Sequence, residues 1–477
     1  MEQSAKKMKK YREQSAWLRT WGFCILLPLF FSLLLVLYIL TGSVDIVSTD
    51  YIRLVNAYLP DTLNPAKLFM PDILTRIPLT YLFRALNVWL FRYSVNFDRL
   101  LGVLGLFLSA VVVLRYAQRM RIPAGFSLLL LVVLFSLNKW ELLLNGSGYA
   151  HFLAFSLFYL HFLLLERWYQ GTAGVRIRRG LLLLPWLVLL AAGPYLLVYA
   201  VCLLLCYSYC VISANRNVRR GDCLHFGLSA LATLLLYLLS NHFAVYEYAG
   251  AQSFGLGTLI RDYPAFSLHF LWNGLASMLL SGELLEALLA RGALTMRGIY
   301  AIGIGVALAY AAAFFLYFRE GLCRRTIFPA LLLLYGLGSH FVVLLSRYVF
   351  LRESYAWQSR YSLQYQSGIL GILLVFALYF SERRKKGAAS PALRFRKAGI
   401  LLLSVAFLLG NCYTSYAEMK KLPYRRARYE EMRAAAEQLQ SYTDPELEEL
   451  FEYHHGGERI RAAYRILEER KLNIFRE

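Results

Sequence analysis

The chain has 477 residues, of which 58% are hydrophobic and 17% charged, and 51 Lys and Arg against 30 Asp and Glu give it a net charge of +21. In a soluble protein such a basic balance would favour nucleic acid as a partner. Here membrane topology and anionic lipid headgroups account for the charge, so we expect no nucleic-acid partner. No Gly-rich phosphate loop is present, which argues against a nucleotide-using enzyme.

Long apolar runs predict an all-α membrane protein with about eleven transmembrane helices, because a helix needs about 20 apolar residues to cross a bilayer. The run 180–213 is interrupted at Gly193-Pro194 and is interpreted as a tight hairpin of two spans. The predicted spans are 22–41, 100–116, 122–138, 148–165, 180–193, 195–213, 223–244, 298–318, 326–346, 362–381 and 398–416.

Alternate connections between these spans are strongly basic, and six of them hold 26 of the 51 Lys and Arg residues. They lie at 6–19, 115–121, 167–179, 216–220, 319–325 and 383–397. Loops rich in Lys and Arg mark the cytoplasmic side, so we expect a multi-pass protein of the cytoplasmic membrane. Residues 1–21 are then a cytoplasmic basic tail, 22–416 the transmembrane domain, and 417–477 an extracytoplasmic helical tail.

Larger connections fall on the opposite, outer side. They are the outer loops 42–99, 245–297 and 347–361. Within the second loop, 266–290 is apolar but holds Glu283 and Glu286, and a carboxylate at mid-membrane costs about 2.5 kcal/mol or more. This segment is therefore predicted to be an interfacial helix on the outer face.

The cysteines predict neither a disulfide framework nor a metal site. Six of the seven lie in spans or on the basic side. Cys202, Cys206 and Cys210 recur along one helix face, but no His or carboxylate joins them, so we interpret them as packing residues. We expect no metal and no cofactor.

The first outer loop is rich in acids, and Asp45 and Asp50 follow the first span directly. Apolar spacing predicts a helix over 51–59 and a second amphipathic helix over 71–91. Asp50 also suits the first turn of the earlier helix, where a carboxylate faces the positive end of the helix dipole. A chemical role and this capping role are compatible.

The loop 347–361 brings three arginines beside aromatic residues. Its candidate binding residues are Arg347, Arg352, Trp357, Arg360 and Tyr361. Arginines hold phosphate bidentately, and aromatic rings stack on sugars. An aromatic belt with snorkelling arginines is the alternative. Arginines are usually enriched on the cytoplasmic side, so three of them in an outer loop call for a reason. Phosphate binding and an aromatic belt both stay open as interpretations.

Trp140 and Glu141 form a further candidate at an outer turn. Glu141 is interpreted either as the partner of Lys139 in a simple ion pair or as a substrate contact. His151 and His161 lie ten residues apart on one predicted span, too far apart to share a metal, so we expect them to be satisfied within the bundle.

This layout resembles the GT-C superfamily of membrane glycosyltransferases, and more narrowly a group of bacterial polytopic proteins within it. That group shows an Asp-Asp-Tyr element in the first outer loop, a Trp-Glu element and a late Ser-Arg-Tyr element. The matching residues are Thr49-Asp50-Tyr51, Trp140-Glu141 and Ser359-Arg360-Tyr361. Thr49 stands in place of the first acid, so only Asp50 carries over and a metal site of paired carboxylates is not expected.

The resemblance implies transfer of a sugar from a polyprenyl-phosphate donor to a glycan or lipid acceptor of the cell envelope. Asp50 would be the general base, and Arg360 with Arg347 or Arg352 would hold the lipid phosphate. Asp45, which also follows the first span directly, is a second candidate catalytic carboxylate. Three alternatives stay open: an inactive scaffold of the same fold, a polysaccharide polymerase, and a flippase for lipid-linked saccharides. The sequence does not indicate an oligomeric state.

Overall fold

A computed structural model describes residues 2–69, 77–213, 218–242, 255–385 and 391–476, which form helices and contain no strand. Ten of these helical stretches are long and apolar enough to cross a membrane, so the chain is a multi-pass all-α membrane protein. They are Gly22–Gly42 in α1, Val95–Arg119 (α4), Ala124–Leu144 (α5 to α6), Gly146–Tyr169 (a short turn and α7, Tyr149–Tyr169), Gly193–Ile212 (a short turn and α9, Leu196–Ile212), Arg220–Asn241 in α10 (Arg220–His242), Met296–Arg319 (α14), Phe328–Phe350 (α15, Phe328–Arg347, and a short turn), Ser359–Glu382 (a short turn and most of α16, Ser362–Lys385) and Arg394–Met419 in α17 (Pro391–Met419).

The predicted span 180–193 corresponds to α8 (Val175–Ala191), a helix of 17 residues that is not among these ten. Two contacts made by α7, one at each end of the bundle, fix the direction of α8, because they locate the segments before and after it. The end of α7 meets the start of α10, where Trp168 Nε1 donates to Asp222 Oδ2 over 3.1 Å. The start of α7 meets the start of α9, where His151 hydrogen-bonds Tyr195. Helix α8 therefore runs back between the two ends of the bundle, antiparallel to α7 and α9.

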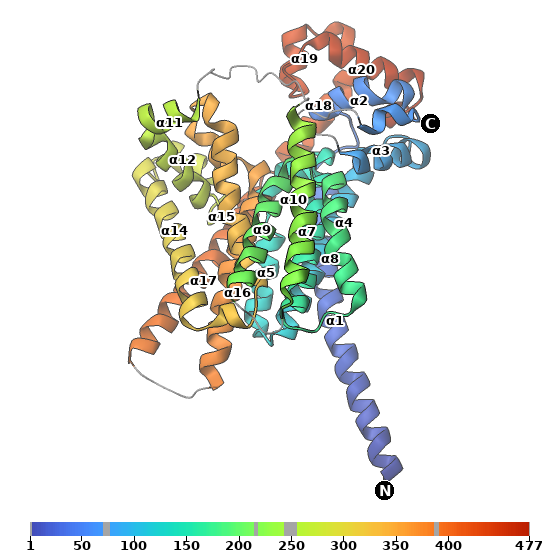
Figure 1. Ribbon diagram of the computed structural model, residues 1–477. Helices are drawn as coiled ribbons and strands as arrows, with labels where there is room; N and C mark the ends of the chain where they lie inside the picture. The colour runs from blue at the N-terminus through green and yellow to red at the C-terminus, as the bar shows by residue number, and fades with distance from the viewer. Residues whose placement is uncertain (1, 70–76, 214–217, 243–254, 386–390, 477) are drawn as a thin grey trace.

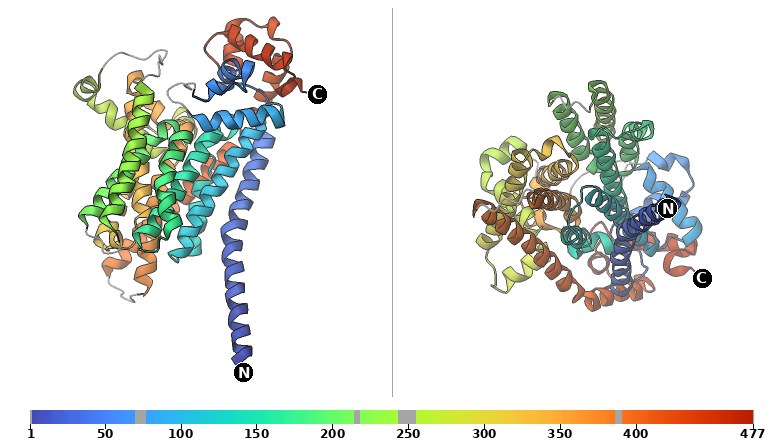
Figure 2. Two further views of the ribbon diagram at one scale, coloured as in Figure 1. Left: turned by 45° about the vertical axis from the view of Figure 1, so that its right-hand side comes forward. Right: turned by 90° about the horizontal axis from the view of Figure 1, so that it is seen from below.

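The described basic connections gather at one end of the bundle, which we call the basic end. Arg119 donates to Thr172 Oγ1 over 3.0 Å, and Gln170 Nε2 donates to the Arg325 carbonyl over 3.3 Å, which ties three connections together. Helix α1 (Glu2–Gly42) extends beyond this end, and α18 to α20 lie at the other, the tail end (Figures 1 and 2). Parts of the predicted basic connections 216–220 and 383–397 lie outside the described residues.

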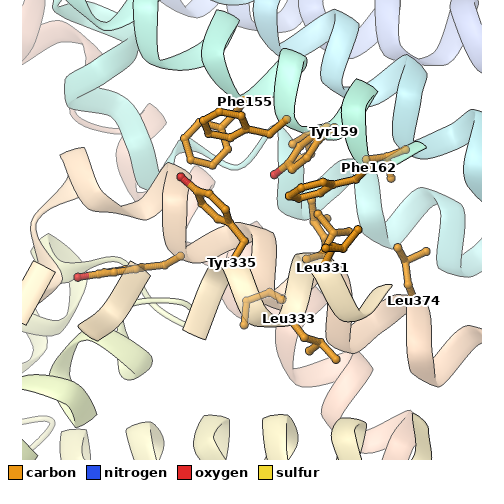
Figure 3. Packing of buried hydrophobic residues seen from close by; sticks show 14 of the residues in the cluster. Phe155, Tyr159, Phe162, Leu331, Leu333, Tyr335 and Leu374 are labelled. Atoms are coloured by element: carbon orange, nitrogen blue, oxygen red, sulfur yellow. The ribbon is translucent and has the colours of Figure 1, made fainter. Parts of the chain in front are cut away.

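The bundle core is built by close approach of α4 to α7 and of α15 to α16 (Ser362–Lys385). A Cβ at Gly105 would lie 2.6 Å from the Phe152 carbonyl carbon, so only glycine permits this distance between α4 and α7. Small residues bring membrane helices together in this way. Aromatic and branched side chains fill the remaining space, including Phe155, Tyr159 and Phe162 from α7 against Leu331 and Tyr335 from α15 (Figure 3).

Residues 266–290 do not form one helix. They fold into α12 (Pro264–Ala276) and α13 (Gly282–Ala290), of 13 and 9 residues, both too short to span a bilayer. The turn between them packs on α17, where Ser281 N donates to Thr414 Oγ1 over 3.1 Å. Helix α12 lies against α14, with the His269 ring stacked on Tyr300 at 4.3 Å. The prediction of a single helix here is wrong, whereas its interfacial position stays a prediction.

The first loop folds as α2 (Asp50–Tyr58) and α3 (Pro78–Phe91), which confirms the predicted helix at 51–59. The start of the predicted helix 71–91, with Asp72 and Arg76, lies outside the described residues. Helix α2 packs on the tail helix α20 (Gly457–Glu469), which in turn packs on α19 (Asp444–Leu450). The first tail helix, α18 (Leu422–Ala436), lies against α1. Tyr464 Oη donates to the Val47 carbonyl over 2.6 Å, and Asn56 Nδ2 donates to the Arg459 carbonyl over 2.8 Å.

The tail is thus joined to the first loop through a common apolar core and is not a separate domain. Buried side chains from both segments share this core. They are Ile46, Val47, Tyr51, Ile52, Val55 and Leu59 from the loop, and Met432, Leu447, Phe451, Ile460, Tyr464 and Leu467 from the tail. The boundary expected at 417 separates two chain segments that fold together.

The change Ile460→Ala tests this shared core. Ile460 is completely buried, so its truncation should lower the free energy of unfolding of the tail by about 2 to 5 kcal/mol. We expect faster proteolysis of both 42–69 and 417–476 under native conditions. Arg465→Ala, on the exposed side of the same helix, is the matched control and should change little. Selective loss of the tail with the first loop still protected would contradict a common core.

Candidate functional site

The three motif segments meet at the tail end of the bundle. Glu141 Oε1 lies 3.3 Å from Arg360 Nε, and the Glu141 backbone N–H donates to Ser359 Oγ over 3.2 Å. The first-loop segment joins through Asn145 Nδ2, which donates to Thr49 Oγ1 over 3.1 Å. Segments separated by more than 90 residues in the chain are therefore linked by direct hydrogen bonds and one ion pair.

Short helical turns hold these segments in place. Helix α5 (Ala124–Leu134) is followed by η3 (Leu137–Lys139) and α6 (Trp140–Leu144), and η9 (Ser359–Tyr361) leads into α16. Polar side chains fix the backbone on both sides of α6, because Ser136 Oγ accepts from Asn138 N in η3 and Asn145 Oδ1 accepts from Ser147 N directly after α6. Polar residues that satisfy free backbone N–H groups fix such turns locally. Glu141 is consequently presented from a fixed turn, and its N–H bond to Ser359 Oγ joins that turn to η9, which carries Arg360.

Asp50 is the first residue of α2 and its side chain is exposed. Among the described residues, its carboxylate makes no hydrogen bond and no ion pair, yet its charge acts on both Glu141 and Arg360. Thr49 before it has φ 52°, and its N–H donates to the Phe451 carbonyl of the tail over 2.9 Å. The tail thus fixes the backbone at the entry to α2, which holds Asp50 near the pair of Glu141 and Arg360.

Further groups surround Arg360. The Arg347 guanidinium carbon lies 5.8 Å from the centre of the Tyr361 ring. The charges of Arg347 and Arg360 both act on the partly buried Tyr195, in η5 (Gly193–Tyr195). We call Asp50, Glu141, Arg347, Arg360 and Tyr361 the Arg360 cluster. It contains two carboxylates and two guanidinium groups, a set suited to binding a phosphate and accepting a proton.

Tyr195 and His151 beside this cluster are absent from the predicted site. His151 Nδ1 hydrogen-bonds the Tyr195 hydroxyl, which confirms His151 as a satisfied histidine. The break at Gly193-Pro194 was the available signal for Tyr195, since it places the following residue at the tail end of a hairpin. The sequence alone does not indicate which of the many tyrosines faces the arginines.

Asp45 occupies a different position from Asp50. Its carboxylate accepts from Ser94 Oγ and Val95 N, each over 2.7 Å, at the start of α4, and pairs with Arg476 over 2.7 Å. This geometry caps a helix N-terminus and ties the end of the chain to it. Because both oxygens are engaged, we assign Asp45 a structural role in place of the expected catalytic one.

Two aromatic candidates are also engaged elsewhere. Trp357 is buried, and its Nε1 donates to Glu286 Oε1 over 2.7 Å, so its ring offers no open face to a sugar. The Trp140 ring lies under Arg425, whose guanidinium carbon is 3.2 Å from the ring centre. Burial alone would lower the pKa of Arg425, but its hydrogen bond to Glu418 and the charges of Glu418 and Glu283 together raise it. Trp140 therefore links the bundle to the tail.

Arg352 and Lys139 differ from expectation in opposite ways. Arg352 is exposed, and its side chain makes no hydrogen bond or ion pair with the described residues. Lys139 is fully buried, and its Nζ donates to the Ser136 carbonyl over 2.7 Å and to Asn138 Oδ1 over 3.2 Å. Of the two interpretations of Glu141, the ion pair with Lys139 is wrong, because Glu141 pairs with Arg360; its role as a substrate contact stays a prediction.

Within the described parts of the chain, no group of three His, Cys, Asp or Glu side chains is placed to hold a metal ion. Cys202, Cys206 and Cys210 are buried along α9, in line with packing. No family model, no curated protein and no solved structure matches this chain. The interpretation of the cluster therefore depends on its own residues and geometry.

A double-mutant cycle on Glu141→Gln and Arg360→Gln tests the central ion pair. Both side chains are partly exposed, at 31% and 47%, so solvent screening reduces the expected coupling to about 0.2–1 kcal/mol in the free energy of unfolding. Reversible unfolding in mixed micelles measures it. Arg352→Gln in place of Arg360→Gln is the control and should show no coupling with Glu141→Gln. Equal coupling in the two cycles would contradict the pairing.

Proposed function

We propose that the chain is a membrane glycosyltransferase that moves a sugar from a polyprenyl-phosphate donor to an acceptor of the cell envelope. The meeting of Asp50, Glu141 and Arg360 supports this proposal most strongly. These residues come from the three motifs that resemble GT-C enzymes, and they lie at the end of the bundle, where a lipid-linked donor and a water-soluble acceptor are both accessible. The proposed acceptor is a glycan or a lipid.

In the proposed reaction, the Asp50 carboxylate accepts the proton of the acceptor hydroxyl. The resulting oxygen attacks the anomeric carbon as the bond from that carbon to the phosphate oxygen breaks, through an oxocarbenium-like state. The electron pair of the broken bond stays on the lipid phosphate. Arg360 and Arg347 stabilise its charge, because guanidinium groups bind phosphate oxygens bidentately.

Different surroundings favour different roles for the carboxylates. Asp50 has no bonded partner in the described chain, so its oxygens are available to a proton. Glu141 is paired with Arg360 and is proposed to orient the guanidinium toward the donor phosphate. Because the Glu141 carboxylate is occupied by Arg360, it is less available than Asp50 to the proton of the acceptor.

We propose that α8 is the eleventh span and that the basic end faces the cytoplasm. Two observations support this topology: α8 runs between the two ends of the bundle, and the chain starts beyond the basic end and finishes at the tail end (Figure 1). An odd number of crossings is required when the termini lie on opposite sides. The Arg360 cluster would then face the extracytoplasmic side, where lipid-linked sugars replace nucleotide sugars as donors.

An inactive scaffold of the same fold is the second candidate. Thr49 occupies the position of an acid in the GT-C motif, and its backbone N–H and hydroxyl are both bonded, to Phe451 and Asn145. A threonine held by these two hydrogen bonds helps to dock the tail on the first loop and has no chemical role. The activity of Asp50 variants distinguishes the two candidates.

Asp50→Asn should lower turnover by about 10²-fold or more while leaving donor binding unchanged, since it removes the base and keeps the shape. Arg360→Lys should weaken donor binding, because it keeps the charge but loses the planar fork. Asp61→Asn, on an exposed acid of the same loop, is the matched control. Sugar transfer from a radiolabelled polyprenyl-phosphate donor measures both effects. Full activity of a well-folded Asp50→Asn protein would refute the catalytic role and favour the scaffold.

Cysteine labelling tests the topology. With Cys412→Ser as background, an impermeant thiol reagent should label Ser441→Cys but not Ser390→Cys in intact cells, because the tail is proposed to lie outside. Residue 390 is outside the described residues but belongs to the basic connection 383–397. Labelling at 390 and none at 441 would reverse the proposed orientation.

A further inference from the structure

A cavity of about 290 Å³ lies at the tail end, between the end of α1, the start of α4 and the tail. None of the five residues of the Arg360 cluster lines it. Three arginines do, namely Arg426 and Arg433 from α18 and Arg476 near the C-terminus, together with the single carboxylate of Asp45. Positive charge therefore exceeds negative charge by two among the lining side chains, which favours an anionic ligand.

The three arginines are engaged to different degrees. Arg476 Nη2 donates to Asp45 Oδ2 over 2.7 Å. Arg426 donates to the Ser43 carbonyl and to Glu430, each over 2.6 Å. The Arg433 side chain is exposed and makes no hydrogen bond or ion pair with any described residue. Arg433 is thus a guanidinium on the cavity wall with all its donors available.

An apolar stripe on α1 leads to this cavity. Five large apolar side chains on one face of the helix, each 50–65% exposed, follow one another at alternating intervals of four and three residues, and the last of them lines the cavity. They are Leu26, Phe30, Leu33, Leu37 and Leu40. This spacing keeps them in line along the helix. The stripe belongs to the span Gly22–Gly42, so it lies at the depth of lipid acyl chains.

We propose that this cavity binds the phosphate of a membrane lipid whose acyl chains lie along the α1 stripe. Arg433, with its free fork, would hold the phosphate oxygens bidentately, and Arg426 and Arg476 would add positive charge. Continuity of the stripe with the cavity favours a lipid over free inorganic phosphate. The site is separate from the Arg360 cluster, so it does not depend on the proposed glycosyltransferase activity.

The test uses the full chain in nanodiscs of phosphatidylcholine containing a minority of phosphatidylglycerol. Native mass spectrometry counts the phosphatidylglycerol that stays bound after release. We expect one retained molecule, and a loss of about tenfold in its retention for Arg433→Gln, because a hydrogen bond to a charged group is worth about that factor or more. Arg433→Lys should fall between the two. Arg465→Gln, on an exposed arginine of the tail that does not line the cavity, is the matched control.

Three results would overturn the proposal. The first is equal retention by the wild-type and Arg433→Gln proteins, each with a normal melting temperature. The second is equal loss in Arg433→Gln and Arg465→Gln, which would indicate attraction by the overall positive charge. The third is displacement of the lipid by millimolar inorganic phosphate with retention of that phosphate, which would identify a site for the free anion.

Discussion

Hydrocarbon offers no hydrogen-bond partner to a peptide group, and the rest of this structure depends on that constraint. A segment that crosses the bilayer must make its backbone hydrogen bonds internally, so it forms a helix. Irregular backbone is restricted to the ends of the bundle, where water, capping side chains or other loops can satisfy it. The short turns that carry Glu141 and Arg360 lie at the tail end for this reason, and the Glu141 N–H finds its partner there in Ser359 Oγ.

The first outer loop and the tail fold together as one unit. The two segments bury a common core, and Thr49 donates to Phe451 in the tail directly before Asp50. The tail therefore contributes to the position of Asp50 although it supplies none of the proposed catalytic groups. Arg425 extends this coupling to the bundle through Trp140 and Glu418. Truncation of the tail would disturb the site as well as the surface.

The sequence predicted the all-helical membrane fold and the helix at 51–59, because both depend on local apolar spacing. It also placed Asp50, Glu141 and Arg360 as candidates through short motifs. It could not predict that Glu141 pairs with Arg360, because that contact depends on how two distant segments pack. The alternative pair with Lys139 could have been rejected, since residues two apart on a helical turn do not face each other. Contacts such as Tyr464 with Val47 depend on how distant segments pack, which local patterns do not encode. The burial of Trp357 against Glu286 was missed for the same reason.

The central claim is that the Arg360 cluster receives the phosphate of a lipid-linked sugar. A cryo-EM structure of the protein in nanodiscs with a polyprenyl-phosphate sugar tests it most directly. We expect phosphate density within hydrogen-bonding distance of Arg360 and Arg347, with the Asp50 carboxylate facing the anomeric carbon. Phosphate density only in the arginine-lined cavity beside α1, with the Arg360 cluster empty, would contradict the claim.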